Sequence, residues 1–181
     1  GLELATTLKK ERPALRVMLM SGYPDAALAQ RAHHHVAARR HQPGTVVDRH
    51  LPPRAARAGV KVHLSESPEK TAPYDLVLTD VPCSGSGSWR RDPMGKWTLT
   101  EARLTQLTAL QAEILDRVVP MLGAKGVLAY ATCSMLRDEN EDQITGFLAR
   151  HSGWTCRMQQ RFSPLSGGDG FFLALLSRED V

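Results

Sequence analysis

Residues 76–84 read Leu76-Val77-Leu78-Thr79-Asp80-Val81-Pro82-Cys83-Ser84, an apolar run that passes into a turn of small residues carrying a cysteine. Residues 127–134 repeat this design and read Val127-Leu128-Ala129-Tyr130-Ala131-Thr132-Cys133-Ser134. Each apolar run is short enough to be a buried strand. Because open α/β sheets bind ligands at the carboxyl ends of their strands, we expect the two thiols to meet in one cleft. The pattern points to cysteine chemistry.

Strand and helix patterns alternate along the rest of the chain. Apolar runs predict strands at residues 17–20, 45–48, 60–64, 75–79, 127–131 and 171–176. Helices are expected at residues 2–11, 26–40 and 138–150, and a further one is expected to open at a Thr98–Glu101 capping box and to end before Pro120. This alternation predicts an α/β fold, a mainly parallel sheet with helices on both faces.

Composition narrows the class of protein. The chain has 181 residues, of which 42% are apolar, enough for the core of one domain. No apolar run approaches the length of about 18 residues that a membrane span needs, so we expect no membrane partner. The cysteines number three, with no C-x-x-C pair, which argues against a structural metal site or a disulfide framework and favours the reduced cytoplasm.

Positive charge is concentrated outside the half that carries Cys83 and Cys133. The formal net charge is +4. Residues 1–70 hold 12 Lys and Arg against 6 Asp and Glu, whereas residues 71–181 hold 11 against 13. Charge alone is therefore weak evidence for a nucleic-acid partner.

The chain from residue 74 to residue 178 resembles the RNA cytosine-5 methyltransferases of the Sun/Fmu (RsmB-like) type. Besides the two cysteine stretches, the matching pieces are Arg90-Arg91-Asp92-Pro93, Lys96-Trp97, residues 110–115, Glu139-Asn140-Glu141 and residues 168–172. The resemblance implies a Rossmann-like sheet that binds S-adenosylmethionine (SAM) and forms 5-methylcytosine in RNA, with ribosomal RNA as the expected substrate. It also implies a covalent adduct between a cysteine and the cytosine.

The resemblance assigns roles to individual residues. Cys133 is expected to be the thiolate that attacks carbon 6 of cytosine, and Cys83 to assist release of the product. Asp80 is expected to lie between the cofactor and the target base. Stacking and phosphate contacts to RNA are expected from Trp89 and from Arg90, Arg91, Lys96 and Trp97.

Each of these residues also has an ordinary structural interpretation. A cysteine after an apolar strand is by default a small buried hydrophobe. Asp80 alone could cap a turn, Trp89 or Trp97 could belong to the core, and Arg90-Arg91 could be a solvated pair. The combination of motifs favours the catalytic interpretation, whereas Cys156 matches no motif and is expected to be structural.

The N-terminal half departs from the family pattern and is expected to be incomplete or divergent. A glycine-rich loop of the type Asp-x-Cys-Ala-Ala-Pro-Gly-Gly-Lys, which approaches SAM, is not found. A faint alignment of residues 35–48 makes Asp48 the acid that binds the cofactor ribose. The loop would then fall at residues 24–34, which contain no glycine.

The first 25 residues are similar to the middle of a response-regulator receiver domain, with Ser21 where that family places its switch hydroxyl. We therefore divide the chain into a receiver-like segment, residues 1–30, and a partial methyltransferase domain, residues 31–181. The leading hypothesis is a SAM-dependent RNA (cytosine-5) methyltransferase. The alternative is an inactive remnant that at most binds RNA, and a weaker third hypothesis is a signalling module.

Overall fold

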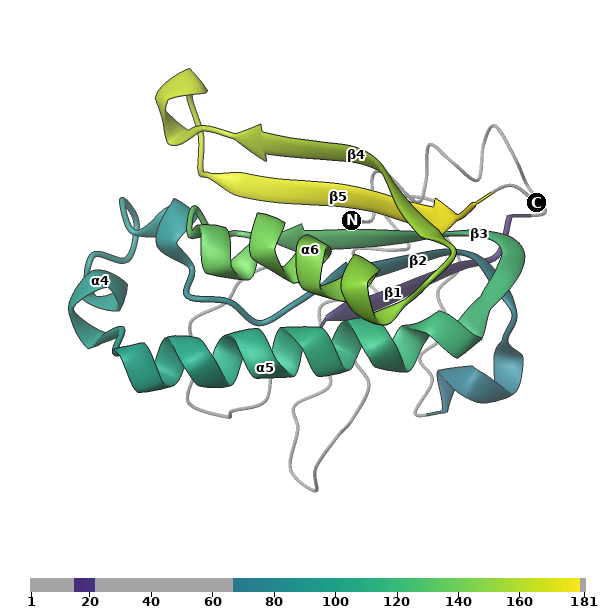
Figure 1. Cartoon of the computed structure of the whole chain (residues 1–181). Helices are drawn as coiled ribbons and strands as arrows, with labels where there is room; N and C mark the ends of the chain where they lie inside the picture. The colour runs from purple at the N-terminus through teal and green to yellow at the C-terminus, as the bar shows by residue number, and fades with distance from the viewer. Residues whose placement is uncertain (1–14, 22–66, 180–181) are drawn as a thin grey trace.

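Five strands form one sheet in the order β1-β2-β3-β5-β4 in the computed structural model, which describes residues 15–21 and 67–179 (Figure 1). The strands are β1 (Val17–Ser21), β2 (Tyr74–Asp80), β3 (Leu122–Thr132), β4 (Trp154–Phe162) and β5 (Phe171–Arg178). The first three are parallel, and β5 runs antiparallel to both β3 and β4. Ser21, Asp80 and Ala131 lie side by side, so β1, β2 and β3 present their carboxyl ends together.

Two helices connect the strands across one face of the sheet. Helix α5 (Glu101–Val118) follows β2, and α6 (Glu141–Arg150) follows β3. Crossover connections between parallel strands are right-handed. The connection from β2 through α5 to β3 and the connection from β3 through α6 to β4 cross the sheet in the same direction, so both helices lie on the same face (Figure 1). Asp116 joins them by accepting hydrogen bonds from Arg150 Nη2 at 3.0 Å and His151 Nε2 at 2.8 Å.

The core lies between this face of the sheet and the two helices. Apolar residues recur on α5 at helical spacing, and Leu107, Ile114, Leu115 and Val118 are buried. Burial of such side chains contributes about 1.5–3 kcal/mol each. The core residues with no more than 1% of their surface exposed are Val77, Leu115, Val118, Leu128, Tyr130, Ile144, Phe147, Phe172, Ala174 and Leu176.

The strands predicted at residues 17–20, 75–79, 127–131 and 171–176 are present, as are the two helices predicted in the second half. The sheet is less parallel than predicted, because β4 and β5 form an antiparallel hairpin. Strand β4 was not predicted, since it is an edge strand whose polar residues outnumber its apolar ones. Its exposed positions have no core to contact and so carry no apolar run.

The predicted capping box at Thr98 is wrong. Thr100 caps α5, because its Oγ1 accepts a hydrogen bond from the backbone N–H of Arg103 at 3.2 Å. Thr98 instead ends the short helix α4 (Met94–Thr98), where its hydroxyl donates to the carbonyl oxygen of Met94 at 3.1 Å.

Several predictions lie outside the described residues. These are the helices at residues 2–11 and 26–40, the strands at residues 45–48 and 60–64, and the division of the chain at residue 30. Residues 17–21, within the receiver-like stretch, pair with β2 and extend the sheet. Within residues 15–21 and 67–179, no helix is long and apolar enough to cross a bilayer.

Candidate active site

The two cysteine turns leave the neighbouring strands β2 and β3 at the same end of the sheet. Cys83 Sγ and Cys133 Sγ lie 3.3 Å apart, and both side chains are half-buried. The backbone joins the turns, because Gly87 N donates to the carbonyl oxygen of Cys133 at 2.9 Å. The thiols therefore meet, as the order of strands and turns predicted.

Glycines let a third loop approach these turns. Gly85 has a φ of +69°, a left-handed conformation that side chains disfavour. Two residues later, the carbonyl oxygen of Gly87 accepts a hydrogen bond from Gly170 N at 2.8 Å. A Cβ atom on Gly87 would collide with the Gly170 carbonyl group, so this contact requires glycine. The loop before β5 thus closes against the Cys83 turn.

A fully buried glutamate lies behind both turns. Glu139 Oε1 accepts hydrogen bonds from Ser84 N at 2.8 Å and from Gln111 Nε2 at 3.1 Å. Its Oε2 accepts from Ser84 Oγ at 2.6 Å and from Ser134 Oγ at 2.5 Å. Ser84 and Ser134 directly follow the two cysteines in the chain, so one carboxyl group contacts both turns.

The neighbouring Asn140 holds the Cys133 turn from the other side. Thr132 Oγ1 donates to Asn140 Oδ1 at 2.6 Å, and Asn140 Nδ2 donates to the carbonyl oxygen of Ser134 at 2.9 Å. Glu139 and Asn140 belong to the segments that carry the family resemblance, but no role was predicted for them. In the sequence they are only a polar pair a few residues after Cys133. Such a pair does not reveal whether its side chains are buried or exposed.

The electrostatic environments of the two thiols differ. The hydrogen bond from Cys83 lowers the pKa of Cys133 below its ordinary value, and burial only partly opposes this effect. The same hydrogen bond, as the larger cause, and burial, as the second, raise the pKa of Cys83 well above its ordinary value. Cys133 is therefore the thiol that ionises first, with Cys83 as its hydrogen-bond donor. A thiolate is the nucleophilic form of cysteine.

Asp80 lies at the end of β2, close to the thiols. Its side chain is exposed, yet the protein around the strand ends removes enough hydration to raise the pKa of the carboxyl group from 3.8 to about 6. Its negative charge in turn acts to raise the pKa of Cys133. Asp80 and Cys133 are therefore electrostatically coupled.

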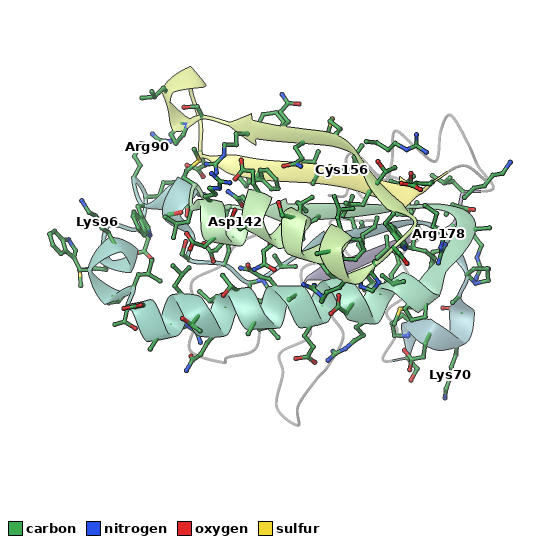
Figure 2. All side chains as sticks on the ribbon, in the orientation of Figure 1. Lys70, Arg90, Lys96, Asp142, Cys156 and Arg178 are labelled. Atoms are coloured by element: carbon green, nitrogen blue, oxygen red, sulfur yellow. The ribbon has the colours of Figure 1, made fainter. Side chains whose placement is uncertain are left out.

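Arg90 and Lys96, two of the basic residues predicted to bind RNA, lie near the same end of the sheet (Figure 2). Arg90 Nη2 lies 3.6 Å from Asp169 Oδ1, and Arg91 also pairs with Asp169. The Trp97 side chain is 75% exposed, and Lys96 Nζ lies 5.5 Å from the centre of its ring. An exposed indole beside a cation is a surface on which a base can stack.

The remaining candidate residues are Cys156, Trp89 and Asp48. Cys156 is on the edge strand β4, where its Sγ contacts the carbonyl oxygen of Met158 at 3.3 Å (Figure 2). Trp89, half-buried, packs close to Gly95. Asp48 lies outside the described residues. No cluster of three His, Cys, Asp or Glu side chains within the described part of the chain could hold a metal ion.

The family of proteins described as 16S rRNA methyltransferase RsmB/F matches residues 56–177. The chain belongs to the RsmB/F family. This confirms the resemblance predicted for residues 74–178, and the match also extends upstream of residue 74.

Two curated relatives match more than half of the chain. Ribosomal RNA small subunit methyltransferase B of Photorhabdus laumondii is 46% identical over an alignment of 113 residues that covers 58% of this chain and 26% of that protein. The protein of the same name from Enterobacter sp. (strain 638) is 38% identical over 138 residues, covering 68% of this chain and 32% of the relative. The chain thus spans about a quarter to a third of the length of these relatives.

Solved structures share the fold. The protein PH0851 superposes with a TM-score of 0.72 at 23% identity, covering 98% of this chain and 45% of that one. NSun6 from Pyrococcus horikoshii, solved with SFG, superposes with a TM-score of 0.69 at 19% identity, and the match covers 99% of this chain and 52% of that one. These likenesses agree with the predicted Rossmann-like α/β fold.

Proposed function

We propose that this chain carries the catalytic part of a SAM-dependent methyltransferase that forms 5-methylcytosine in RNA, with ribosomal RNA as substrate, in the cytoplasm. The observation that carries the proposal is the pair of thiols 3.3 Å apart at the carboxyl ends of two parallel strands. The names of the curated relatives support the class of substrate.

Cys133 supplies the nucleophile. Its Sγ adds to carbon 6 of cytosine, which makes carbon 5 electron-rich enough to take up a methyl group. The hydrogen bond from Cys83 favours the thiolate that this step needs. The base must leave its stack to be reached, so the substrate is a single-stranded or flipped cytidine.

The residues at the strand ends fit a cationic cofactor. Asp80 is an exposed carboxyl group that interacts electrostatically with Cys133, so negative charge faces the place where chemistry occurs. Opposite charges attract strongly in such a partly desolvated setting. Asp80, together with Asp48 for the ribose, would hold SAM, which supplies an electrophilic methyl group when bound.

Cys83 assists the release of product. After methylation, carbon 5 carries both the new methyl group and its original proton. Transfer of that proton to the ionised Cys83 lets the Cys133 sulfur leave carbon 6 as a thiolate, restores the double bond of the ring and returns Cys83 to the thiol form. Once Cys133 is bonded to carbon 6, it no longer accepts the hydrogen bond that raises the pKa of Cys83. Cys83 can then ionise more easily beside the adduct.

Contacts to the RNA backbone and to neighbouring bases come from Arg90, Arg91, Lys96 and Trp97. The arginines and the lysine attract phosphates, and the exposed indole offers a stacking surface. These residues follow the Cys83 turn in the sequence, and we place the RNA strand on either side of a flipped cytidine against them.

The test is methyl transfer from labelled SAM to a small-subunit ribosomal RNA transcript by the 181-residue protein, followed by digestion and detection of 5-methylcytosine. We expect labelled 5-methylcytosine with the natural chain and none with Cys133→Ala. Equal turnover by both proteins would contradict the assigned nucleophile.

A second candidate is a folded domain that no longer binds SAM. The missing glycine-rich loop favours it, because residues 24–34 contain no glycine that would let the backbone approach the cofactor. Calorimetric titration with SAM separates the two functions. Saturable binding supports the enzyme, whereas no binding by a folded chain supports the inactive domain.

A further inference from the structure

Glu139 connects the two cysteine turns although it belongs to neither. It lies in a short 3-10 helix (Arg137–Glu139) just before α6. Its two oxygens accept four hydrogen bonds, two from Ser84, one from Ser134 and one from Gln111. Each serine directly follows a cysteine, so a movement of Glu139 would alter the spacing of the two sulfurs.

Glu139 is itself held in place by the core. Tyr130 donates its hydroxyl to the backbone carbonyl oxygen of Glu139 at 2.6 Å. Gln111 Nε2 also donates to the carbonyl oxygen of Pro82 at 2.8 Å, just before Cys83. Tyr130 and Gln111 are fully buried in β3 and α5. The position of Glu139 is therefore set by the strand that carries one cysteine and by the helix that follows the other.

Burial of a carboxyl group is costly unless all its hydrogen bonds are made. An apolar side chain could fill the same space at lower cost. It could not, however, bind a backbone N–H and two hydroxyl groups from separate loops. Three of the four described hydrogen bonds of the Glu139 carboxyl group come from Ser84 and Ser134, beside the cysteines, the fourth comes from Gln111 on α5, and none comes from a sulfur. This arrangement suits positioning rather than direct chemistry.

We propose that Glu139 is a positioning residue that sets the distance between Cys83 Sγ and Cys133 Sγ and thereby controls release of the methylated base. This inference rests on the proposed function. It predicts that loss of the Glu139 carboxyl group leaves attack by Cys133 possible and impairs the step that needs Cys83.

Glu139→Gln is the informative variant, because glutamine has a similar shape but cannot accept four hydrogen bonds. Attack should persist, because Cys133 and its place after β3 are retained. Loss of the Cys83 hydrogen bond raises the pKa of Cys133, and removal of the Glu139 charge, which itself acts to raise that pKa, offsets part of the change. Release should slow by about 100-fold, the effect of a small displacement of a reacting group. Denaturing gels with labelled RNA and SAM should then show a covalent protein–RNA band that persists, as with Cys83→Ala. The kcat should fall, and KM for RNA should fall with it, because the adduct accumulates when release is slow.

Glu113→Gln is the matched control. Glu113 is exposed on α5 and pairs with Arg117 one turn later, and the described contacts of this pair do not include either cysteine turn. It should behave like the natural chain in every assay. Release by Glu139→Gln at the natural rate, or activity lost only in proportion to the unfolded fraction, would overturn the proposal.

A second measurement does not depend on methyl transfer. Phenylarsine oxide loses its oxygen as water when two thiols bind its arsenic atom, so its affinity reports how close the two sulfurs lie. We expect binding by Glu139→Gln to weaken by about 100-fold towards the one-thiol level of Cys83→Ala. If the natural chain forms neither adduct nor product, the proposed function fails, and this comparison still decides whether Glu139 positions the thiols.

Ser84→Ala covers the case in which Glu139→Gln does not fold. It removes one of the two hydrogen bonds from the Cys83 turn to Glu139 and retains the one from the backbone. We expect Ser84→Ala to weaken phenylarsine oxide binding and to lengthen the lifetime of the protein–RNA adduct, each by less than Glu139→Gln does. A folded Ser84→Ala protein with natural values for both would refute the positioning role.

Discussion

Gly170 donates its backbone N–H to the carbonyl oxygen of Gly87 at 2.8 Å, so the loop before β5 lies directly on the loop that carries Cys83. The next residue of the hairpin, Phe171, begins the strand that pairs with β4. Through this contact, the antiparallel hairpin at one edge of the sheet supports a site built on the parallel strands (Figure 1).

Gly87→Ala should therefore destabilise the protein by about 1–3 kcal/mol, the usual cost of forcing an atom into a packed site. Its Cβ atom would meet the Gly170 carbonyl group, which is backbone and cannot move away cheaply. Thermal unfolding measures the change. Gly146→Ala is the control: Gly146 lies within α6, and the atom nearest to its new Cβ is the flexible end of Arg150 at 3.2 Å. It should stabilise the protein by about 0.5–1 kcal/mol.

The two thiols should differ in reactivity. Because Cys133 has the lower pKa, iodoacetamide should modify it before Cys83, and its rate should rise with pH to a midpoint below the ordinary cysteine value. Cys83→Ala removes the hydrogen bond that lowers the pKa of Cys133, so the midpoint should move to higher pH. Peptide mass mapping of timed samples measures both. Earlier modification of Cys83 in the natural chain would reverse the assignment of nucleophile and donor.

Binding of SAM should weaken as the pH falls through about 6, because the Asp80 carboxyl group takes up a proton there and loses the charge that attracts the sulfonium. Calorimetric titration between pH 5 and 8 would measure the trend. Asp80→Asn should bind SAM more weakly and without this pH dependence. An unchanged pH profile in Asp80→Asn would show that another group is responsible.

Asp80→Asn should also stabilise the fold at alkaline pH. The folded pKa of about 6 lies above the usual 3.8, so the ionised carboxylate costs stability above pH 6, and the cost vanishes below pH 3.8. The full shift would correspond to about 3 kcal/mol, but solvent screening of this exposed group reduces the expected gain to about 1 kcal/mol at pH 8. Denaturant unfolding of both proteins at pH 8 and pH 4 tests the sign, and a larger gain at pH 4 would contradict it.

Arg90→Ala should weaken RNA binding and make it less dependent on salt. Loss of one phosphate contact lowers the slope of log affinity against log salt by about 0.7 for a single strand. Fluorescence anisotropy at several KCl concentrations measures this slope. Lys70→Ala is the control, because Lys70 is exposed and lies at the other end of the molecule (Figure 2). Equal effects of the two substitutions would indicate diffuse attraction rather than a defined contact.

Local patterns were sufficient to predict the framework of this protein. The apolar runs of β2 and β3 are strands whose residues are buried or half-buried, and a continuous apolar run is a signal that a single sequence displays. Their cysteine turns could be assigned to one end of the sheet, because parallel strands end together. The polar edge strand β4 could not be predicted, since an edge strand meets solvent and its residue types are weakly constrained.

The active-site geometry depends on contacts between residues far apart in the chain. Three acidic side chains, Asp138, Glu139 and Glu141, stand close together, and their identities do not reveal which one is buried. Packing of α6 beside β3 turns Glu139 inward to two serines that lie 5 and 55 residues away, and the same packing leaves Asp138 exposed. The apolar pattern of the sequence thus determined the strands and the end at which the thiols emerge. Only tertiary packing determined the distance of 3.3 Å between the sulfurs and the position of Glu139 behind the two turns. Hydrogen bonds between residues 50 or more positions apart leave no local pattern in the sequence.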